Sequence, residues 1–250
     1  LLPGVPEALK AFKDKGYRLV VVTNQAYERL IREQLPLLRP ENVLLEPARR
    51  NTAPCIAWAA SHINDICPGA SMIVTPADHV VVDTAAFESK VRAGFEFVEG
   101  RDALLTLGIE PNRPETGYGY IRLGERVEGD IYKVRQFMEK PDLATAKRFL
   151  EEGDYMWNAG IFLWSVKSIL KAFELYMPKD AVLFREAFSG GFSRERLERV
   201  FGECTATSID YGIMEKAGNV FVEKADMGWS DLGTWSSLHE LSPRDADENF

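Results

Sequence analysis

Two aspartates, Asp78 and Asp231, stand among small and apolar residues in short polar segments. Asp78 follows an apolar run in the segment TPADH, and Asp231 lies far along the chain in the segment WSDLG. Two carboxylates that converge from separate loops suit Mg²⁺, which binds one or two protein carboxylates together with waters and phosphate oxygens. Taken singly, each aspartate is also explained by a turn or by the capping of a helix N-terminus.

A second set of residues has the chemistry of a site for a phosphorylated sugar. Lys140 follows Glu139 directly, so a cation that can bind a phosphate is next to a carboxylate that can bind sugar hydroxyls. The alternative is that the two residues form a solvated charge pair. Asn158 offers a donor and an acceptor to sugar hydroxyls, or caps a neighbouring turn. Gly119 admits a ligand close to the backbone, or serves only a turn.

The segment EPARRNTAP, residues 46–54, combines a carboxylate with the start of a predicted helix. Asn51 and Thr52 are typical helix-capping residues, and the free N–H groups of a helix N-terminus attract anions. Guanine presents adjacent N1–H and N2–H₂ donors that one carboxylate can accept together, whereas adenine has no such pair. If this segment forms a base pocket, Glu46 favours guanine.

These polar segments lie at the ends of predicted strands that alternate with predicted helices. Apolar and β-branched runs predict strands over 17–23, 42–45, 71–75, 103–109, 117–123, 131–139, 158–164 and 220–224. Apolar residues at helical spacing predict helices over 7–15, 26–35, 52–63, 84–98, 143–152, 167–177, 194–201 and 234–241. This order predicts an α/β fold with a mostly parallel central sheet flanked by helices, in which ligands bind beyond the carboxyl ends of the strands.

Composition bounds the class of protein. The 250 residues are 46% hydrophobic and 27% charged with a net charge of −8, which predicts a globular core and argues against a broad nucleic-acid surface. The printed sequence shows neither an apolar run long enough for a membrane span nor the pattern of a secretory signal. Three cysteines without metal-like spacing favour a reducing cytoplasm. We expect one domain over residues 1–241 and a charged tail over 242–250.

Seven motifs, taken together, resemble those of bacterial mannose-1-phosphate guanylyltransferases in order and spacing. They are EPARRNTAP, TPADH, RPETGYGYI, EKPD, WNAGIFLW, SIDYGIMEK and WSDLGTW, and the resemblance extends from about residue 20 to about residue 241. It implies a Rossmann-like, GT-A-like nucleotidyltransferase fold. It also implies transfer of GMP from GTP to mannose 1-phosphate, which gives GDP-mannose and pyrophosphate.

The same resemblance implies roles for individual residues. The catalytic set would be Asp78 and Asp231, which would hold Mg²⁺, and Lys140, which would contact the sugar phosphate. The guanine would be bound by Glu46, Asn51 and Thr52. The mannose side would be lined by Glu115, Thr116, Gly119, Glu139, Asn158 and Asp210. Mg²⁺, Lys140 and Arg50 would supply the local positive field that lets an acidic protein bind two anions.

The printed sequence departs from the resembled family at its start. The family opens with a strand and a glycine-rich loop of the form GGxGxRxWP, followed by a Pro-Lys pair, and this loop binds the triphosphate. We therefore expect impaired transfer, and the alternative is a non-catalytic module that binds a nucleotide sugar. Residues 1–25 instead resemble a segment of haloacid-dehalogenase-type phosphatases, without their upstream aspartate nucleophile. The sequence does not specify the oligomeric state, so a homodimer stays open.

Overall fold

The computed structural model describes residues 5–188 and 193–233, so the predicted helix 234–241 and tail 242–250 lie outside the described residues. The strands are β1 (Val21–Asn24), β2 (Val43–Glu46), β3 (Ser71–Val74), β4 (Val80–Val81), β5 (Leu104–Ile109), β6 (Tyr120–Glu128), β7 (Ile131–Met138), β8 (Tyr155–Ser165), β9 (Val220–Lys224) and β10 (Trp229–Ser230). The helices are α1 (Val5–Asp14), α2 (Glu28–Gln34), α3 (Thr52–Ile66), α4 (Thr84–Val98), α5 (Leu143–Glu152), α6 (Val166–Tyr176), α7 (Pro178–Phe188) and α8 (Arg194–Glu203). Short helical turns are η1 (Gln25–Tyr27), η2 (Pro40–Asn42) and the π-helix η3 (Asp210–Met214).

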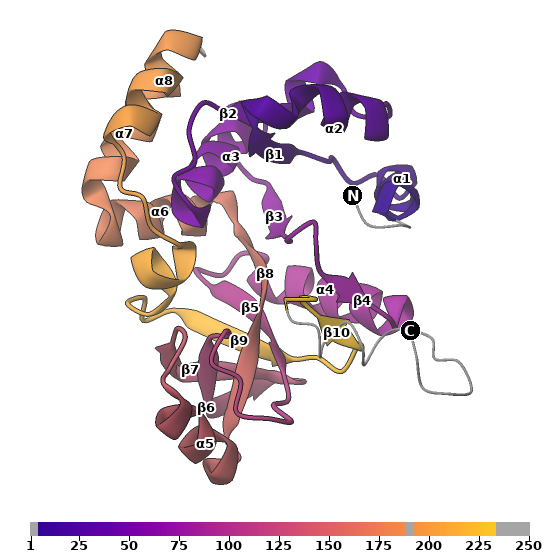
Figure 1. Ribbon diagram of the computed structural model, residues 1–250, viewed down its shortest axis with the longest axis vertical. Coiled ribbons are helices and arrows are strands. Elements are labelled where there is room, and N and C mark those ends of the chain that lie inside the picture. Colours follow the sequence, from indigo (N-terminus) through magenta and orange to yellow (C-terminus); the bar gives the residue numbers. More distant parts are fainter. Residues whose placement is uncertain (1–4, 189–192, 234–250) are drawn as a thin grey trace.

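The central sheet has six strands in the order β3-β8-β5-β9-β7-β6, with helices on both sides of it (Figure 1). Among the described strands of this sheet, β5 and β9 pair in parallel and the other pairs are antiparallel. The α/β class is confirmed, and the central sheet is mixed. β3, β5, β9 and β6 run in one direction, and β8 and β7 run against them, so the expectation of a mostly parallel sheet holds for strand direction but not for the neighbouring pairs. β8 enters antiparallel between β3 and β5, and a buried strand is equally apolar in either direction, so composition does not reveal its direction.

Strand β8 contacts three other strands. Residues 155–157 of β8 pair with β6, residues 162–165 pair with β3, and β5 runs along the opposite edge. Because β6 pairs with both β7 and β8, the strands β8, β5, β9, β7 and β6 form a closed ring of pairings. β8 changes neighbour near Gly160, whose φ of +69° lies in the left-handed region that glycine adopts without steric cost.

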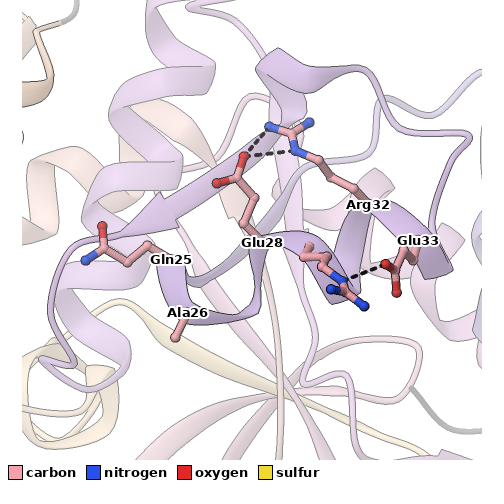
Figure 2. Close-up of a pocket in the computed structure, with 6 residues that line it drawn as sticks. Gln25, Ala26, Glu28, Arg32 and Glu33 are labelled. Carbon is pink, nitrogen blue, oxygen red and sulfur yellow. Dashed lines mark hydrogen bonds and ion pairs between the residues drawn. The ribbon is translucent and has the colours of Figure 1, made fainter.

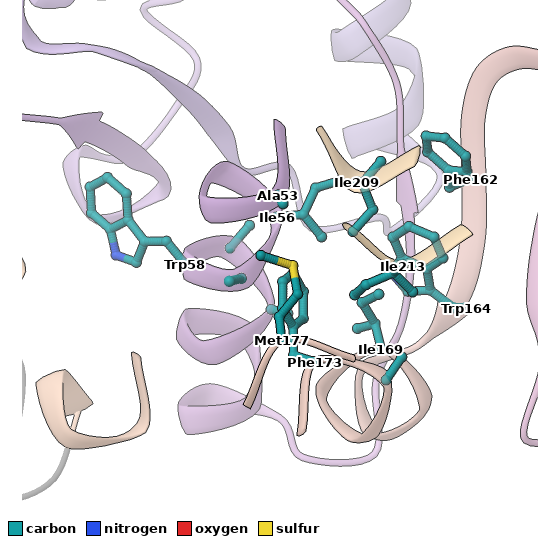
Figure 3. Close-up of a cluster of buried hydrophobic side chains, with 14 of the residues drawn as sticks. Ala53, Ile56, Trp58, Phe162, Trp164, Ile169, Phe173, Met177, Ile209 and Ile213 are labelled. Atoms are coloured by element: carbon teal, nitrogen blue, oxygen red, sulfur yellow. The ribbon is translucent and has the colours of Figure 1, made fainter. Parts of the chain in front are cut away.

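Alternate residues of the central strands face opposite layers of helices. Leu104 and Trp164 face the larger core, which includes residues of α3, α6, α7 and α8. Figure 3 shows part of this core, where α3 and α6 meet the side chains of β8. Leu105 and Leu163, one residue away on each strand, pack against α4 instead. This period-2 alternation explains why both strands read as continuous apolar runs.

Two smaller sheets flank the central one. β1 and β2 form a parallel pair, covered by Ile31 and Leu35 at α2. β4 and β10 form a short antiparallel ribbon of two residues on each side. Neither strand of this ribbon is predicted by the sequence patterns, and neither is α7 or η3. No helix within residues 5–188 and 193–233 combines the length and apolar character needed to cross a membrane.

Candidate active site

The β4–β10 ribbon brings Asp78 and Asp231 together. Ser230 pairs with Val80, and continuing this antiparallel register places Asp231 opposite His79. Oδ1 of Asp78 lies 3.9 Å from Nε2 of the same histidine. Burial lowers the pKa of His79, and the charges of both aspartates act against this shift. The two carboxylates predicted to share a metal therefore both lie near one imidazole ring.

The two aspartates have oxygen atoms to offer a cation. The Asp78 side chain is 86% exposed. Oδ1 of Asp231 accepts hydrogen bonds from the Tyr118 hydroxyl at 2.6 Å and from the Gly233 N–H at 2.9 Å, which leaves Oδ2 without a hydrogen bond in the described part of the chain. Hard carboxylate oxygens with room for water and phosphate suit Mg²⁺. Since no cluster of three or more His, Cys, Asp or Glu side chains is poised for a metal among the described residues, the remaining ligands would be water and substrate.

A series of aromatic rings supports this pair of aspartates. The His79 and Trp229 ring centroids lie 5.4 Å apart, and the Trp229 indole N–H donates to Nδ1 of His79 at 3.2 Å. Trp229 then packs edge-on against Tyr118 at 5.3 Å, and Tyr118 against Trp157 at 5.2 Å. None of these rings was assigned a role from the sequence. The sequence indicates a role for these rings only through their position, because each ring lies within or beside a motif that holds a predicted site residue.

Gly119, Glu139 and Asn158 converge as predicted for the sugar side. A β-carbon at Gly119 would lie 2.5 Å from Oε2 of Glu139 and 3.4 Å from the β-carbon of Asn158. The Asn158 backbone N–H donates to the Gly119 carbonyl at 2.8 Å. Nζ of Lys140 lies 3.6 Å from Oε1 of Glu139, and the lysine side chain is 57% exposed. An ammonium group thus stands at the open side of a tightly packed polar cluster.

Asp210 joins this cluster through Asn158. Nδ2 of Asn158 donates to Oδ1 of Asp210 at 3.0 Å, and Asp210 is the first residue of the π-helix η3. π-helical turns occur often at functional sites. Oδ1 of Asn158 accepts from the hydroxyl of Thr106 at 2.8 Å and from the Gly160 N–H at 3.3 Å. Thr106, a buried residue of β5, is a member of the cluster that was not predicted from the sequence.

The carboxyl groups of the cluster are harder to ionise than free ones. Burial, with a smaller contribution from the charge of Asp210, raises the pKa of Glu139 to about 7, although Lys140 opposes the shift. Burial also raises the pKa of Asp210, against hydrogen bonds from Asn158 and Ser208. A carboxyl with a pKa of about 7, as in Glu139, can both donate and accept near neutral pH, which suits hydroxyl groups of a sugar.

Glu115 and Thr116 lie in the loop that leads into β6. Oε1 of Glu115 accepts the N–H groups of Thr116 at 3.0 Å and Gly117 at 3.1 Å, and Oε2 lies 3.3 Å from Nε of Arg113. The Arg113 guanidinium lies over the Trp157 ring, 5.2 Å from its centroid. Glu115 therefore shapes its own loop, in which Thr116 is exposed.

The residues predicted at the guanine lie at the end of β2 and the start of α3. Oε1 of Glu46 is buried and has no hydrogen-bond partner in the part of the chain that the structure describes, and burial raises the pKa of this carboxyl to about 7. The Asn51 side chain accepts from the Thr52 N–H at 2.8 Å, which confirms the predicted helix start. The Thr52 hydroxyl accepts from the Ile209 N–H at 2.9 Å, so it ties α3 to the segment just before Asp210.

Arg50 has a different partner from the one expected. Its guanidinium donates to the carbonyls of Phe201 at 2.6 Å and Gly202 at 3.1 Å, at the C-terminal end of α8. The last carbonyls of a helix carry partial negative charge and attract cations. Arg50 therefore caps α8, and Lys140 is the predicted cation that stands beside the cluster.

Strained backbone coincides with these segments. The non-glycine residues with positive φ in the described ranges are Asn51 at +70°, Lys140 at +48° and Leu232 at +51°. Such conformations are uncommon outside glycine and cluster at functional sites. Asn51, at the start of α3, and Lys140, at the proposed phosphate contact, are themselves predicted site residues. Leu232 directly follows the predicted site residue Asp231.

Two hollows on the surface do not include a predicted site residue. The larger, about 580 Å³, is lined by Gln25, Ala26, Glu28, Arg29, Arg32 and Glu33 (Figure 2). Its arginines pair with glutamates one turn away along α2, Arg29 with Glu33 at 2.8 Å and Arg32 with Glu28 at 2.8 Å. The smaller, about 240 Å³, lies near α6. The charges of the larger hollow are already balanced, so the polar cluster remains the better candidate for an anionic substrate.

Comparison with known proteins identifies the class. The chain belongs to the nucleotidyl transferase family, whose sequence model matches residues 7–248. The mannose-1-phosphate guanylyltransferase of Escherichia coli K12 is 40% identical over 243 residues, which are 92% of this chain and 50% of that protein. The xanthan biosynthesis protein XanB of Xanthomonas campestris (strain ATCC 33913) is 39% identical over 236 residues, with the same shares covered. The resemblance inferred from the seven motifs is thereby confirmed.

A solved structure shares the fold. The crystal structure from Thermus thermophilus described as a mannose-1-phosphate geranyltransferase superposes with a TM-score of 0.85 at 31% identity, and the match covers 96% of this chain and 69% of that one. The predicted nucleotidyltransferase fold is confirmed. The chain spans about half the length of the curated relatives it matches.

Proposed function

We propose that this chain forms the site for transfer of GMP from GTP to mannose 1-phosphate, which gives GDP-mannose and pyrophosphate. The observation that carries the proposal is the convergence of Gly119, Glu139, Asn158 and Asp210 beside the ammonium group of Lys140. The names of relatives about 40% identical support the same activity.

The reaction needs positioning and charge neutralisation more than covalent chemistry. A phosphate oxygen of mannose 1-phosphate attacks the α-phosphorus of GTP, and the bond to pyrophosphate breaks as the new P–O bond forms. Pyrophosphate leaves with the electron pair of the broken bond. An enzyme accelerates such a step by aligning the two anions and by stabilising the charge that develops on their oxygens.

Individual residues take separate parts of this task. Nζ of Lys140 is exposed next to the cluster, and it contacts the phosphate of mannose 1-phosphate. Glu139 and Asn158 bind sugar hydroxyls, because one carboxyl oxygen and one amide-bearing side chain border the space above Gly119. Asp210 holds the Asn158 amide from the opposite side. Glu46 accepts from guanine through its carboxyl group, in which Oε1 has no hydrogen-bond partner among the described residues.

Asp78 and Asp231 are the residues that would hold Mg²⁺. When bound there, the cation would neutralise phosphate charge in the transition state. Asp78 provides a largely exposed carboxylate, and Asp231 provides one whose orientation is fixed by Tyr118. A metal site of two carboxylates leaves most coordination positions to water and phosphate oxygens, as Mg²⁺ requires.

Calorimetric titration of the purified chain with GDP-mannose, with and without Mg²⁺, tests the proposal. We expect Mg²⁺-dependent binding of GDP-mannose and no comparable binding of UDP-glucose, the matched control. Equal binding of both nucleotide sugars, or of neither, would contradict the proposed specificity. A sensitive assay of pyrophosphate release then separates a transferase from a module that only binds the nucleotide sugar.

A further inference from the structure

Tyr118 contacts two of the proposed catalytic residues at once. Its hydroxyl donates to Oδ1 of Asp231 at 2.6 Å, and its backbone carbonyl accepts from the N–H of Lys140 at 3.2 Å. Asp231 and Lys140 come from loops far apart in the sequence, and Tyr118 lies in a third loop, before β6. One residue thus connects the metal side of the candidate site with its phosphate side.

The position of Tyr118 is tightly fixed. The residue is 8% exposed, and its ring packs edge-on against both Trp157 and Trp229. A hydroxyl that donates to an ionised carboxylate makes a short, charge-assisted hydrogen bond, stronger than one between neutral groups. The Lys140 backbone has a φ of +48°, and the hydrogen bond to Tyr118 helps to hold this strained conformation.

We propose that Tyr118 is a positioning residue, which orients the Asp231 carboxylate for a divalent cation and fixes Lys140 in the same arrangement. Together with the Gly233 N–H, the Tyr118 hydroxyl occupies Oδ1 of Asp231, and Oδ2 accepts no hydrogen bond from the described residues. Carboxylates that bind metals are themselves held by hydrogen bonds, and these partners contribute to metal affinity. The proposal rests on the metal role of Asp231 within the proposed function.

The test is direct binding of Mn²⁺ to the purified full chain, followed by water proton relaxation. Tyr118→Phe keeps the ring between the two indoles and removes the donor alone. We expect this variant to bind Mn²⁺ about tenfold more weakly than the parent. Tyr155→Phe is the matched control, because it removes a hydroxyl from the same buried aromatic cluster, but this hydroxyl bonds to Gln136 at 3.4 Å and not to an aspartate. It should bind Mn²⁺ as the parent does.

A double-mutant cycle separates positioning from a general loss of structure. If Tyr118 acts through Asp231, Tyr118→Phe has little further effect on Mn²⁺ binding in the Asp231→Asn background. The inference is overturned if Tyr118→Phe weakens Mn²⁺ binding equally in the parent and in the Asp231→Asn background. It is also overturned if Tyr118→Phe binds Mn²⁺ as tightly as the parent, or if the parent does not bind Mn²⁺. GDP-mannose is titrated separately. A parent that binds Mn²⁺ but not this sugar nucleotide counts against the proposed function, while the Mn²⁺ comparisons still decide the role of Tyr118.

Discussion

The side-chain amide of Asn158 donates to Oδ1 of Asp210 across 3.0 Å, and so joins the central sheet to the π-helix η3. The neighbouring groups favour one orientation of this amide. The Gly160 N–H is a donor that lies 3.3 Å from Oδ1, which fixes this atom as the acceptor. The hydroxyl of Thr106 lies 2.8 Å from the same oxygen and 3.1 Å from the carbonyl oxygen of Ile161, so its one proton is shared between these two acceptors. A residue outside every recognised motif therefore helps to set which edge of Asn158 a ligand meets.

Thr106→Val should weaken binding of mannose 1-phosphate. The change keeps the shape of the side chain and removes the donor to Asn158, a loss that costs about 1 kcal/mol or roughly fivefold in affinity. Calorimetric titration with mannose 1-phosphate measures the effect. Thr205→Val is the control, because it removes a hydroxyl bonded to Asp180, away from the cluster. Parent-like affinity in Thr106→Val would remove Thr106 from the site.

Asp78→Asn and Asp231→Asn should both abolish the Mg²⁺-dependent part of GDP-mannose binding. Their effects on stability should differ. Asp78 is 86% exposed, so its replacement should change the free energy of unfolding by less than about 0.5 kcal/mol. Asp231→Asn weakens two hydrogen bonds to a charged acceptor and should cost about 1 kcal/mol or more. Thermal unfolding and titration with and without Mg²⁺ check both statements, and retained Mg²⁺ dependence in both variants would remove the metal site.

Gly119→Ala should disturb the sugar side through sterics alone. The new β-carbon would lie 2.5 Å from Oε2 of Glu139, so this carboxylate must move. We expect at least a roughly tenfold loss of mannose 1-phosphate affinity, since small misplacements at a site are costly. Gly202→Ala is the control, because a β-carbon there meets nothing within 4 Å. Parent-like binding in Gly119→Ala would show that Glu139 does not touch the sugar.

Glu46→Gln should reduce discrimination between guanine and adenine nucleotides. An amide can accept only one of the two adjacent donors that guanine presents, and its own N–H₂ repels the other. Competition between GDP and ADP for the chain measures the change in preference. Because Oε1 of Glu46 is buried and no described residue bonds to it, the variant should fold at least as well as the parent. An unchanged base preference would place the guanine elsewhere.

The stability contributed by buried carboxyl groups should fall as the pH rises from about 4.5 to about 7, because these groups hold protons in the folded chain. Burial raises the pKa of Glu223 to about 7, and Lys90 opposes the shift. The folded chain therefore keeps a proton that the unfolded chain has released, so this contribution is present in full below about pH 4.5 and is lost as the pH rises through about 7. The raised pKa values of Glu46 and Glu139 act with the same sign.

Glu223→Gln isolates one group of this pH dependence. The side chain of Glu223 is 3% exposed, and Lys90 keeps Asp130 as a partner at 2.7 Å when the charge is removed. The melting temperature of the variant should fall less steeply between about pH 4.5 and 7 than that of the parent. Glu151→Gln, at an exposed position, should leave the slope unchanged. Identical slopes for all three proteins would refute the assignment to Glu223.

Much of the scaffold could be predicted from the sequence because its signals are local. The bounds predicted for α4, α5 and β9 agree with the structure, since each has clear periodicity or a short β-branched run between turn residues. The pairing of Asp78 with Asp231 was inferred from chemistry. The element that joins them, β4 with β10, has two residues on each strand and is too short to leave a pattern.

Other features depend on contacts between distant segments. Nothing near Thr106 in the sequence shows that its hydroxyl meets Asn158, because threonine is common in buried strands and its partner lies across the sheet. Tyr118 stands in a motif, but the aspartate that it binds comes from the far end of the described chain. The direction of β8 is likewise set by its neighbours rather than by its composition.

The place of β9 in the closed ring has a consequence for biosynthesis. Residues 220–224 lie between β5 and β7, although both neighbours are synthesised long before them. A ribosome that has completed β8 therefore holds a nascent chain whose β5 and β7 present unpaired backbone groups, which are edges prone to aggregation. Cooperative closure waits for β9, so truncation before Val220 should yield insoluble product, whereas the same chain extended past this strand can fold.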